Sequence, residues 1–166
     1  MLAKPLFRFD NVGSVQNWTA IDDRVMGGIS RSRLHYEVAG HAVFEGVVSL
    51  ERSGGFASVR SETGPLGLPG ADACVIEARG DAKRFKLNLF TEDAFDSLSY
   101  QATFTPSAEC WSSIRLPISE FTARFRGREV TGAPALDPAR IRQVGLMIAG
   151  GQSSAFALCV RSIVLV

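Results

Sequence analysis

Apolar and polar residues alternate one by one along several short stretches of this chain. In residues 84–89 every second side chain is apolar: Phe85, Leu87 and Leu89. The same alternation recurs in three further stretches, residues 100–104, 144–148 and 156–160. A period of two is the pattern of β-strands that turn one face to a core and the other to solvent. We therefore expect a chain built mainly from strands.

Glycine- and proline-rich segments separate these stretches. Residues 64–70 read Gly-Pro-Leu-Gly-Leu-Pro-Gly, which can continue neither a helix nor a central strand. Helix signals are confined to short turns at 117–121 and at 137–142, where Asp137 is an N-cap acceptor before a proline. This spacing predicts an all-β fold, an antiparallel β-sandwich or jelly roll. With 166 residues and no linker or repeat, we expect one domain over residues 1–166.

The net charge and the cysteine content limit the classes of function that the chain can have. Eighteen basic and 17 acidic residues give a net charge of +1, so no general basic field favours nucleic acid as a partner. Three widely spaced cysteines and two histidines offer no zinc-ligand spacing, and the cysteines are expected to be reduced thiols. No apolar run is long enough for a transmembrane segment, and the first residues do not resemble a signal or transit peptide. These features predict a cytoplasmic protein.

Patterns typical of catalysis are missing from the sequence. There is no Gly-x-Ser-x-Gly elbow, no phosphate-binding glycine loop and no zinc-binding histidine helix. Asp22 and Asp23 supply oxygen atoms, but Arg24, Val25 and Met26 interrupt the alternating ligands of a calcium loop. We therefore predict a protein that is not an enzyme and that needs no cofactor or metal.

Two Gly-Gly segments stand out from the strand pattern. One is Asp22-Asp23-Arg24-Val25-Met26-Gly27-Gly28-Ile29-Ser30, and the other is Ser53-Gly54-Gly55-Phe56-Ala57-Ser58-Val59-Arg60. Paired glycines usually mark left-handed backbone or a close approach of two backbones. We expect the first segment to be a shaped loop that couples the N-terminal part of the chain to the sandwich, against the second segment.

These motifs together resemble one family. They comprise Trp18, the Asp23-x-Val25-Met26-Gly27-Gly28-x-Ser30 loop, Phe44-x-Gly46-x-x-Ser49-Leu50, and Gly54-Gly55-Phe56-Ala57-Ser58-Val59-Arg60. The match continues through Tyr100, Trp111, Pro117, Phe121, Leu136-Asp137-Pro138-x-Arg140-Ile141 and Gly145-Leu146-Met147-Ile148. The chain resembles the complex I intermediate-associated protein 30 family, named after an assembly factor of mitochondrial NADH:ubiquinone oxidoreductase.

The resemblance implies a galactose-binding-like β-sandwich of jelly-roll type. It also implies a non-enzymatic assembly factor or chaperone that acts through protein contacts, with no catalytic residues to carry over. Because the chain lacks the N-terminal extension of mitochondrial members, we expect a compact bacterial member.

The polar side chains that project from strands and loops suggest where a partner binds. We predict a binding site that combines six residues: Asp23, Arg24, Arg60, Lys86, Asn88 and Tyr100. The expected partner is a protein, such as a respiratory-complex subunit or assembly intermediate. The alternative is a carbohydrate-binding module that binds a glycan.

Two structural interpretations stand beside this site. The Asp23 carboxylate would cap the backbone amides of the following turn, which is a usual role of aspartate in loops. Lys86 and Asn88 would lie on an ordinary solvated sheet face.

Overall fold

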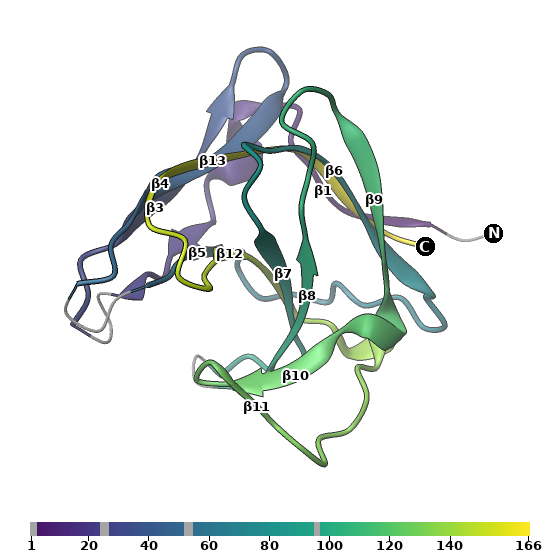
Figure 1. The fold of residues 1–166 in the computed structure, drawn as a ribbon. Coiled ribbons are helices and arrows are strands. Elements are labelled where there is room, and N and C mark those ends of the chain that lie inside the picture. Colours follow the sequence, from purple (N-terminus) through teal and green to yellow (C-terminus); the bar gives the residue numbers. More distant parts are fainter. Residues whose placement is uncertain (1–2, 24–26, 52–54, 95–96) are drawn as a thin grey trace.

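The structure, a computed structural model, describes residues 3–23, 27–51, 55–94 and 97–166. In this part of the chain, a six-stranded sheet and a seven-stranded sheet, both antiparallel, pack against each other (Figure 1). The predicted all-β, antiparallel β-sandwich is therefore confirmed.

The six-stranded sheet, sheet A, has the strand order β3-β4-β13-β6-β9, with β1 also paired to β13. Its strands are β1 (Lys4–Arg8), β3 (Arg31–Glu37), β4 (His41–Val48), β6 (Ala73–Arg79), β9 (Ser112–Pro117) and β13 (Ser154–Leu165). The seven-stranded sheet, sheet B, has the order β11-β10-β8-β7-β12-β5-β2. Its strands are β2 (Thr19–Ala20), β5 (Ala57–Arg60), β7 (Phe85–Phe90), β8 (Ser99–Phe104), β10 (Thr122–Phe125), β11 (Arg128–Glu129) and β12 (Gln143–Ile148).

The long strand β13 organises sheet A. Its first part pairs with β4 and its last part with β1, while β6 lies along its other side. In the sequence, the apolar alternation of residues 156–160 stops after Val160. The structure instead has one strand of 12 residues, in which a register shift between Val160 and Ser162 reverses the alternation.

Strand β3 was not predicted from the sequence. Its residues, Arg-Ser-Arg-Leu-His-Tyr-Glu, are mostly polar, so no apolar face is visible in the pattern. Pairing with β4 along the whole strand, from Arg31 opposite Val47 to Glu37 opposite His41, makes it a strand nonetheless.

In the described chain, two helical turns lie where the sequence placed them, and one was not predicted. Short 3₁₀ turns occur at η3 (Ile118–Glu120) and η4 (Pro138–Arg140), and a third, η1 (Val12–Val15), precedes β2. At η4, the Asp137 side chain accepts a hydrogen bond of 3.0 Å from the amide of Ala139, so the expected N-cap forms.

The core lies between the two sheets. Sheet A contributes Phe44 and Phe156, whose rings contact each other and Phe85 of sheet B. Leu87 and Leu89 are also fully buried. Because successive side chains point to opposite faces, this arrangement turns Lys86 and Asn88 to the outer face of sheet B.

Candidate binding face

The first Gly-Gly segment is joined to the second through a buried carboxylate. Asp23 is 0 % exposed, and its side chain accepts hydrogen bonds from the amides of Ser30 (2.8 Å), Gly55 (2.7 Å) and Phe56 (3.3 Å). The hydroxyl of Ser30 donates to the same carboxylate. Burial alone would raise the pKa of Asp23, but these hydrogen bonds outweigh it and keep the pKa below the usual value. The expected coupling of the two segments is confirmed.

The neighbouring carboxylate, Asp22, connects the two sheets. One oxygen accepts hydrogen bonds from the Ser32 hydroxyl (2.5 Å) and the Ser58 amide (3.0 Å), and the other accepts from the Ser32 amide (3.0 Å). Ser32 belongs to β3 of sheet A and Ser58 to β5 of sheet B. The Asp22–Asp23 pair therefore links the two sheets. The carboxylate oxygens of both residues accept hydrogen bonds from donors of the protein itself.

The structure brings together only part of the predicted site. Arg24 lies outside the described residues. Asp23 faces the interior of the loop junction, and Tyr100 turns into the core, where it is 4 % exposed and donates a hydrogen bond of 3.0 Å to the Pro134 carbonyl. The three remaining residues, Arg60, Lys86 and Asn88, share the outer face of sheet B.

Strand register defines how these three residues lie. Arg60 of β5 and Asn88 of β7 both pair with Gly145 of the intervening strand β12. A Cβ added to Gly145 would lie 3.4 Å from both the Asn88 side chain and the Phe90 ring, so glycine leaves room between them. The Arg60 guanidinium lies over the Phe90 ring, 4.5 Å from its centroid, in a cation–π contact.

Asn88 is buried, although it projects from the outer face of sheet B. It is 3 % exposed and pairs across the sheet with Gln101, which is 8 % exposed. Both side-chain amides donate to the Met147 sulfur, at 3.9 Å from Asn88 Nδ2 and 3.8 Å from Gln101 Nε2. The carbonyl oxygens of both amides are buried, and neither accepts a hydrogen bond from a described residue. A buried polar group without a partner typically costs about 1–3 kcal/mol, so this pair is an unusual feature.

Lys86 and Arg124 add positive charge on either side of the amide pair. Along β8, Thr103 pairs with Lys86, Gln101 pairs with Asn88, and Ser99 pairs with Arg124 of β10. Burial of the half-exposed Lys86 side chain, and then the charge of Arg124, lower the pKa of Lys86. Within the described part of the chain, neither cation forms an ion pair with a carboxylate. We call Lys86, Asn88, Gln101, Arg124 and Met147 the amide face.

Three members of the amide face were missed by the sequence prediction. Gln101 and Met147 lie in two of the stretches that alternate between apolar and polar residues, at positions between the apolar ones. The period of two therefore predicts that they face outward, as Asn88 does. The same alternation puts Tyr100 on the core side with Ala102 and Phe104. Arg124 carries no comparable signal, because the four-residue strand β10 is too short to show a period.

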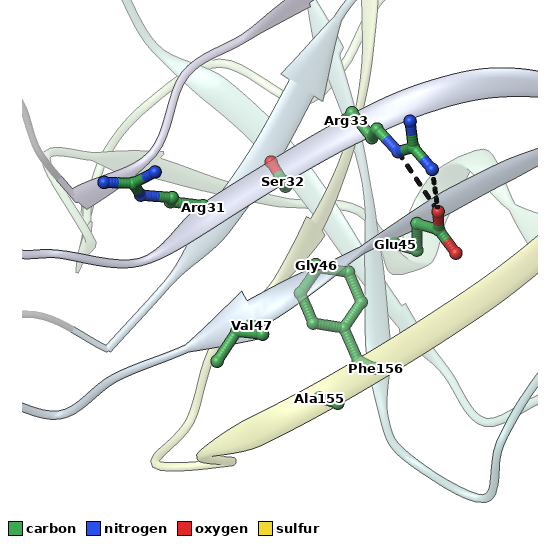
Figure 2. Close-up of a pocket in the computed structure, with 8 residues that line it drawn as sticks. All are labelled: Arg31, Ser32, Arg33, Glu45, Gly46, Val47, Ala155 and Phe156. Atoms are coloured by element: carbon green, nitrogen blue, oxygen red, sulfur yellow. Dashed lines mark hydrogen bonds and ion pairs between the residues drawn. The ribbon is translucent and has the colours of Figure 1, made fainter.

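The outer face of sheet A has a shallow pocket as a second candidate. It has a volume of about 360 Å³ and lies over β3, β4 and the start of β13 (Figure 2). The lining residues are Arg31, Ser32, Arg33, Glu45, Gly46, Val47, Ala155 and Phe156. Figure 2 shows Arg33 turned to Glu45, with contacts of 3.1 and 2.7 Å, whereas Arg31 points away.

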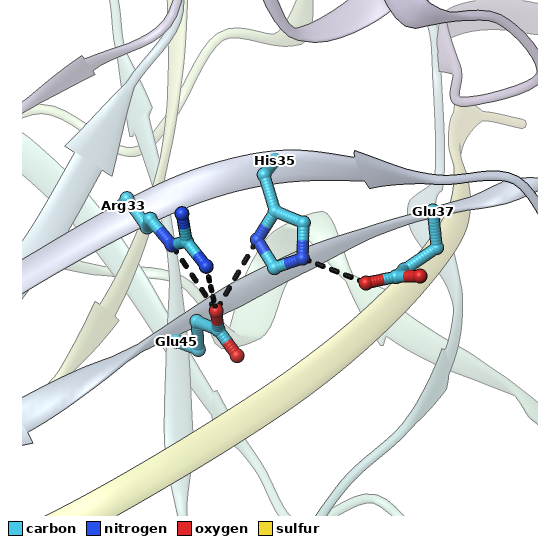
Figure 3. Close-up of polar contacts among 4 residues, drawn as sticks. All are labelled: Arg33, His35, Glu37 and Glu45. Carbon is cyan, nitrogen blue, oxygen red and sulfur yellow. Dashed lines mark hydrogen bonds and ion pairs between the residues drawn. The ribbon is translucent and has the colours of Figure 1, made fainter.

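A row of charges extends from this pocket along β3 (Figure 3). Glu45 Oε1 lies 2.7 Å from Arg33 Nη2 and 3.4 Å from His35 Nδ1, and His35 Nε2 lies 2.9 Å from Glu37. His35 Nε2 is hydrogen-bonded to Glu37, whereas its Nδ1 is buried and forms no hydrogen bond with a described residue. Because these charges neutralise one another in solvent, such pairs stabilise the fold by about 0–1 kcal/mol. This surface offers a ligand less uncompensated charge than the amide face.

Both tryptophans pack within the protein. Trp18 contacts the rings of Phe7 and Phe9, with the Phe7 centroid at 4.9 Å. Trp111 lies beneath the guanidinium of Arg161, which is 4.0 Å from its centroid, and near that of Arg79 at 5.3 Å.

Comparison with known proteins decides the family. The sequence pattern of the family described as complex I intermediate-associated protein 30 matches residues 7–160. The chain belongs to this family. An uncharacterized protein of Schizosaccharomyces pombe is 32 % identical over 178 residues, a match that covers 91 % of this chain and 80 % of the yeast protein.

A second relative carries the name of the complex I intermediate-associated protein 30 family. It is complex I intermediate-associated protein 30, mitochondrial, of Drosophila melanogaster, 23 % identical over 175 residues. This match covers 92 % of our chain but 59 % of the fly protein, so the chain spans about three fifths of that relative.

Solved structures with the same fold as this member of the complex I intermediate-associated protein 30 family include carbohydrate-binding modules. The family 11 module of a cellulosomal cellulase of Clostridium thermocellum superposes with a TM-score of 0.68 at 18 % identity, covering 100 % of this chain and 95 % of the module. A family 29 carbohydrate-binding module gives 0.57 at 12 % identity, covering 100 % and 92 %. The galactose-binding-like jelly roll is thus confirmed, and identities this low show the fold alone.

Proposed function

We propose that the chain is a non-catalytic binding module that helps to assemble NADH:ubiquinone oxidoreductase, complex I, through protein contacts in the cytoplasm. The observation that carries the proposal is the family match over residues 7–160, together with the printed name of the Drosophila relative. Across the described residues, no group of three or more His, Cys, Asp or Glu side chains has the geometry of a metal site. None of the described helices is long and apolar enough to span a membrane.

The amide face is the surface we propose for the partner. It combines Lys86 and Arg124, which lack a carboxylate partner in the described chain, with two amides whose oxygens accept no hydrogen bond. Such groups are only partly satisfied in the free protein, and a bound partner would complete their interactions. The carboxylates of the Asp22–Asp23 junction are bonded to donors of the protein itself, and Arg33 of the β3 row is paired with Glu45.

The proposal is tested by affinity capture of the tagged chain from the cells that produce it, followed by mass spectrometry and native gels of complex I. We expect complex I subunits to be enriched, and enrichment to fall when Lys86→Met and Arg124→Met are combined. Arg115→Met is the matched control, because Arg115 is an exposed cation on the outer face of sheet A. The proposal would be refuted if respiratory subunits were not enriched and cells lacking the chain assembled complex I normally.

A glycan ligand is the second candidate. It is favoured by the shared fold of the carbohydrate-binding modules and by the side-chain amides, which hydrogen-bond well to hydroxyl groups. Against it, the aromatic ring on this part of the described face, Phe90, is 1 % exposed and lies beneath Arg60, so it offers no platform for a sugar ring. A glycan array without binding would remove this candidate, and turnover in a hydrolase screen would contradict the non-catalytic assignment.

A further inference from the structure

The side chain of Met147 covers the amide pair from a neighbouring strand. Met147 belongs to β12 and Gln101 to β8, and β7 lies between these two strands. The Met147 sulfur lies 3.8 Å from Gln101 Nε2, so the Met147 and Gln101 side chains meet over β7. The same sulfur lies 3.9 Å from Nδ2 of Asn88, which belongs to β7. Met147 thus lies across Asn88 as a cover.

This cover is held weakly. A thioether is a weak acceptor, and methionine has three rotatable bonds and adapts readily to different surroundings. The Met147 side chain is itself partly exposed. Its displacement therefore loses two weak N–H···S contacts and frees both amides to turn.

The amides beneath Met147 and the cations beside it determine which kind of ligand can bind at the amide face. Asn88 and Gln101 each have one carbonyl oxygen to which no described residue donates, and a peptide backbone supplies N–H donors at regular intervals. Lys86 and Arg124, at opposite ends of the pair in register, supply positive charge that no carboxylate of the described chain neutralises. An extended acidic peptide segment supplies both kinds of group: backbone N–H donors for the two amide oxygens, and carboxylates for the two cations.

We propose that the amide face binds an extended acidic segment of a partner protein, and that Met147 is the movable cover of this site. Binding displaces the methionine, so that Asn88 and Gln101 hydrogen-bond to the segment backbone while its carboxylates pair with Lys86 and Arg124. This inference rests on the proposed function, because it gives the recognition chemistry for the same face.

The test uses the purified chain and a fluorescein-labelled peptide of about ten residues with alternating glutamate and serine, long enough to cross several strands. Anisotropy is measured at about 50 mM salt, where charge pairs are weakly screened. A peptide in which lysine replaces glutamate is the charge control. A hexamer of galacturonate tests whether an acidic glycan is preferred.

For each variant we expect a defined change in the affinity for the acidic peptide. Lys86→Met should weaken binding about tenfold by removing a charge-assisted contact. Met147→Ala should tighten binding about threefold, because the ligand no longer displaces a side chain. Arg115→Met should bind like the unchanged protein. Circular dichroism verifies folding, and Lys86→Met is expected to fold because it removes a partly desolvated charge.

Several results would overturn the inference. These are equal affinity for the glutamate and lysine peptides, equal affinity of the Lys86→Met variant, weaker binding by Met147→Ala, or tighter binding of galacturonate than of the acidic peptide. Nuclear magnetic resonance gives an independent measure, since the side-chain amide signals of Asn88 and Gln101 should shift on titration. If complex I subunits are captured but the peptide does not bind, only this inference fails. If the peptide binds as expected without capture of complex I subunits, only the proposed function fails.

Discussion

At the scale of single residues, the most distinctive group is a buried anion, Asp23, for which the described part of the chain shows no cation partner. Asp23 is fully buried, and its charge is balanced by backbone amides and one hydroxyl. Charge-assisted hydrogen bonds of this kind are about twice as strong as neutral ones. The aspartate of the family motif therefore caps backbone amides, as the sequence suggested, but two of them belong to the second Gly-Gly segment and not to the following turn.

Replacing this carboxylate should destabilise the fold. Asp23→Asn keeps the shape of the side chain but places an N–H₂ group among N–H donors, which we expect to cost about 3 kcal/mol in the free energy of unfolding. The folded pKa of Asp23 lies below the usual value, so its stabilisation is complete above about pH 4 and is lost as the pH falls through the folded pKa. Urea titrations from pH 7 down to pH 3 measure both effects. A variant as stable as the unchanged chain, with the same acid dependence, would contradict this role.

Residue identity alone misplaced one member of the site. Tyr100 attracted attention as an aromatic group with a hydroxyl, yet its strand alternates so that Gln101 faces outward. Lys86 and Asn88 were correctly placed on one face because their own alternation was used. The burial of Asn88 was not predictable from its own strand, because its side chain contacts Met147 of β12, which is far away in the sequence.

At the scale of elements, the close approach of β3 and β4 depends on one glycine. A Cβ added to Gly46 would lie 2.0 Å from the carbonyl oxygen of Arg31 and 2.8 Å from the Cα of Ser32, both backbone atoms of β3. Neither atom can move without separating the two strands. This contact gives a physical reason for glycine in the Phe44-x-Gly46 motif.

The alanine variant of this position should therefore be strongly destabilised. Gly46→Ala is expected to lower the free energy of unfolding by about 3 kcal/mol through overpacking against backbone. Gly64→Ala is the matched control, since its added Cβ meets no atom within 4 Å, and we expect a change of about 0.5 kcal/mol or less. Chemical denaturation of both variants checks the difference. Equal stability of the two would show that β3 and β4 adjust freely.

Elements with a strong alternation were predictable, and those without it were not. Strand β7 shows both faces clearly in its sequence, whereas β3 has few apolar side chains and becomes a strand through pairing with β4. The alternation over residues 156–160 marks only part of β13, because a bulge after Val160 shifts the apolar side chains by one position. Pairing partners and bulges are tertiary properties, which local patterns do not encode.

At the scale of the whole molecule, the two sheets are linked by polar groups as well as by the core. Asp22 bonds to both β3 and β5, and Asp23 bonds to Ser30 and to the second Gly-Gly segment. The family motifs thus lie at a structural junction, whereas the amide face lies on the outer surface of sheet B. A variant of the amide face should therefore alter binding with little effect on how the sheets are held together.

Near its two ends the described chain pairs with itself, and this has a mechanical consequence. β1 and β13 run antiparallel, with Lys4 opposite Leu165 and Arg8 opposite Ser162, and Figure 1 shows the two segments side by side. Force applied between residues 4 and 165 loads the hydrogen bonds one pair at a time, since they lie perpendicular to the strands. We expect β1 to peel from β13 at low force in optical-tweezers experiments. Handles at residues 8 and 165 load the same strands lengthwise and should require a higher force. A partner that pulls at residues 4 and 165 would thus unzip the edge of sheet A first and leave sheet B in place.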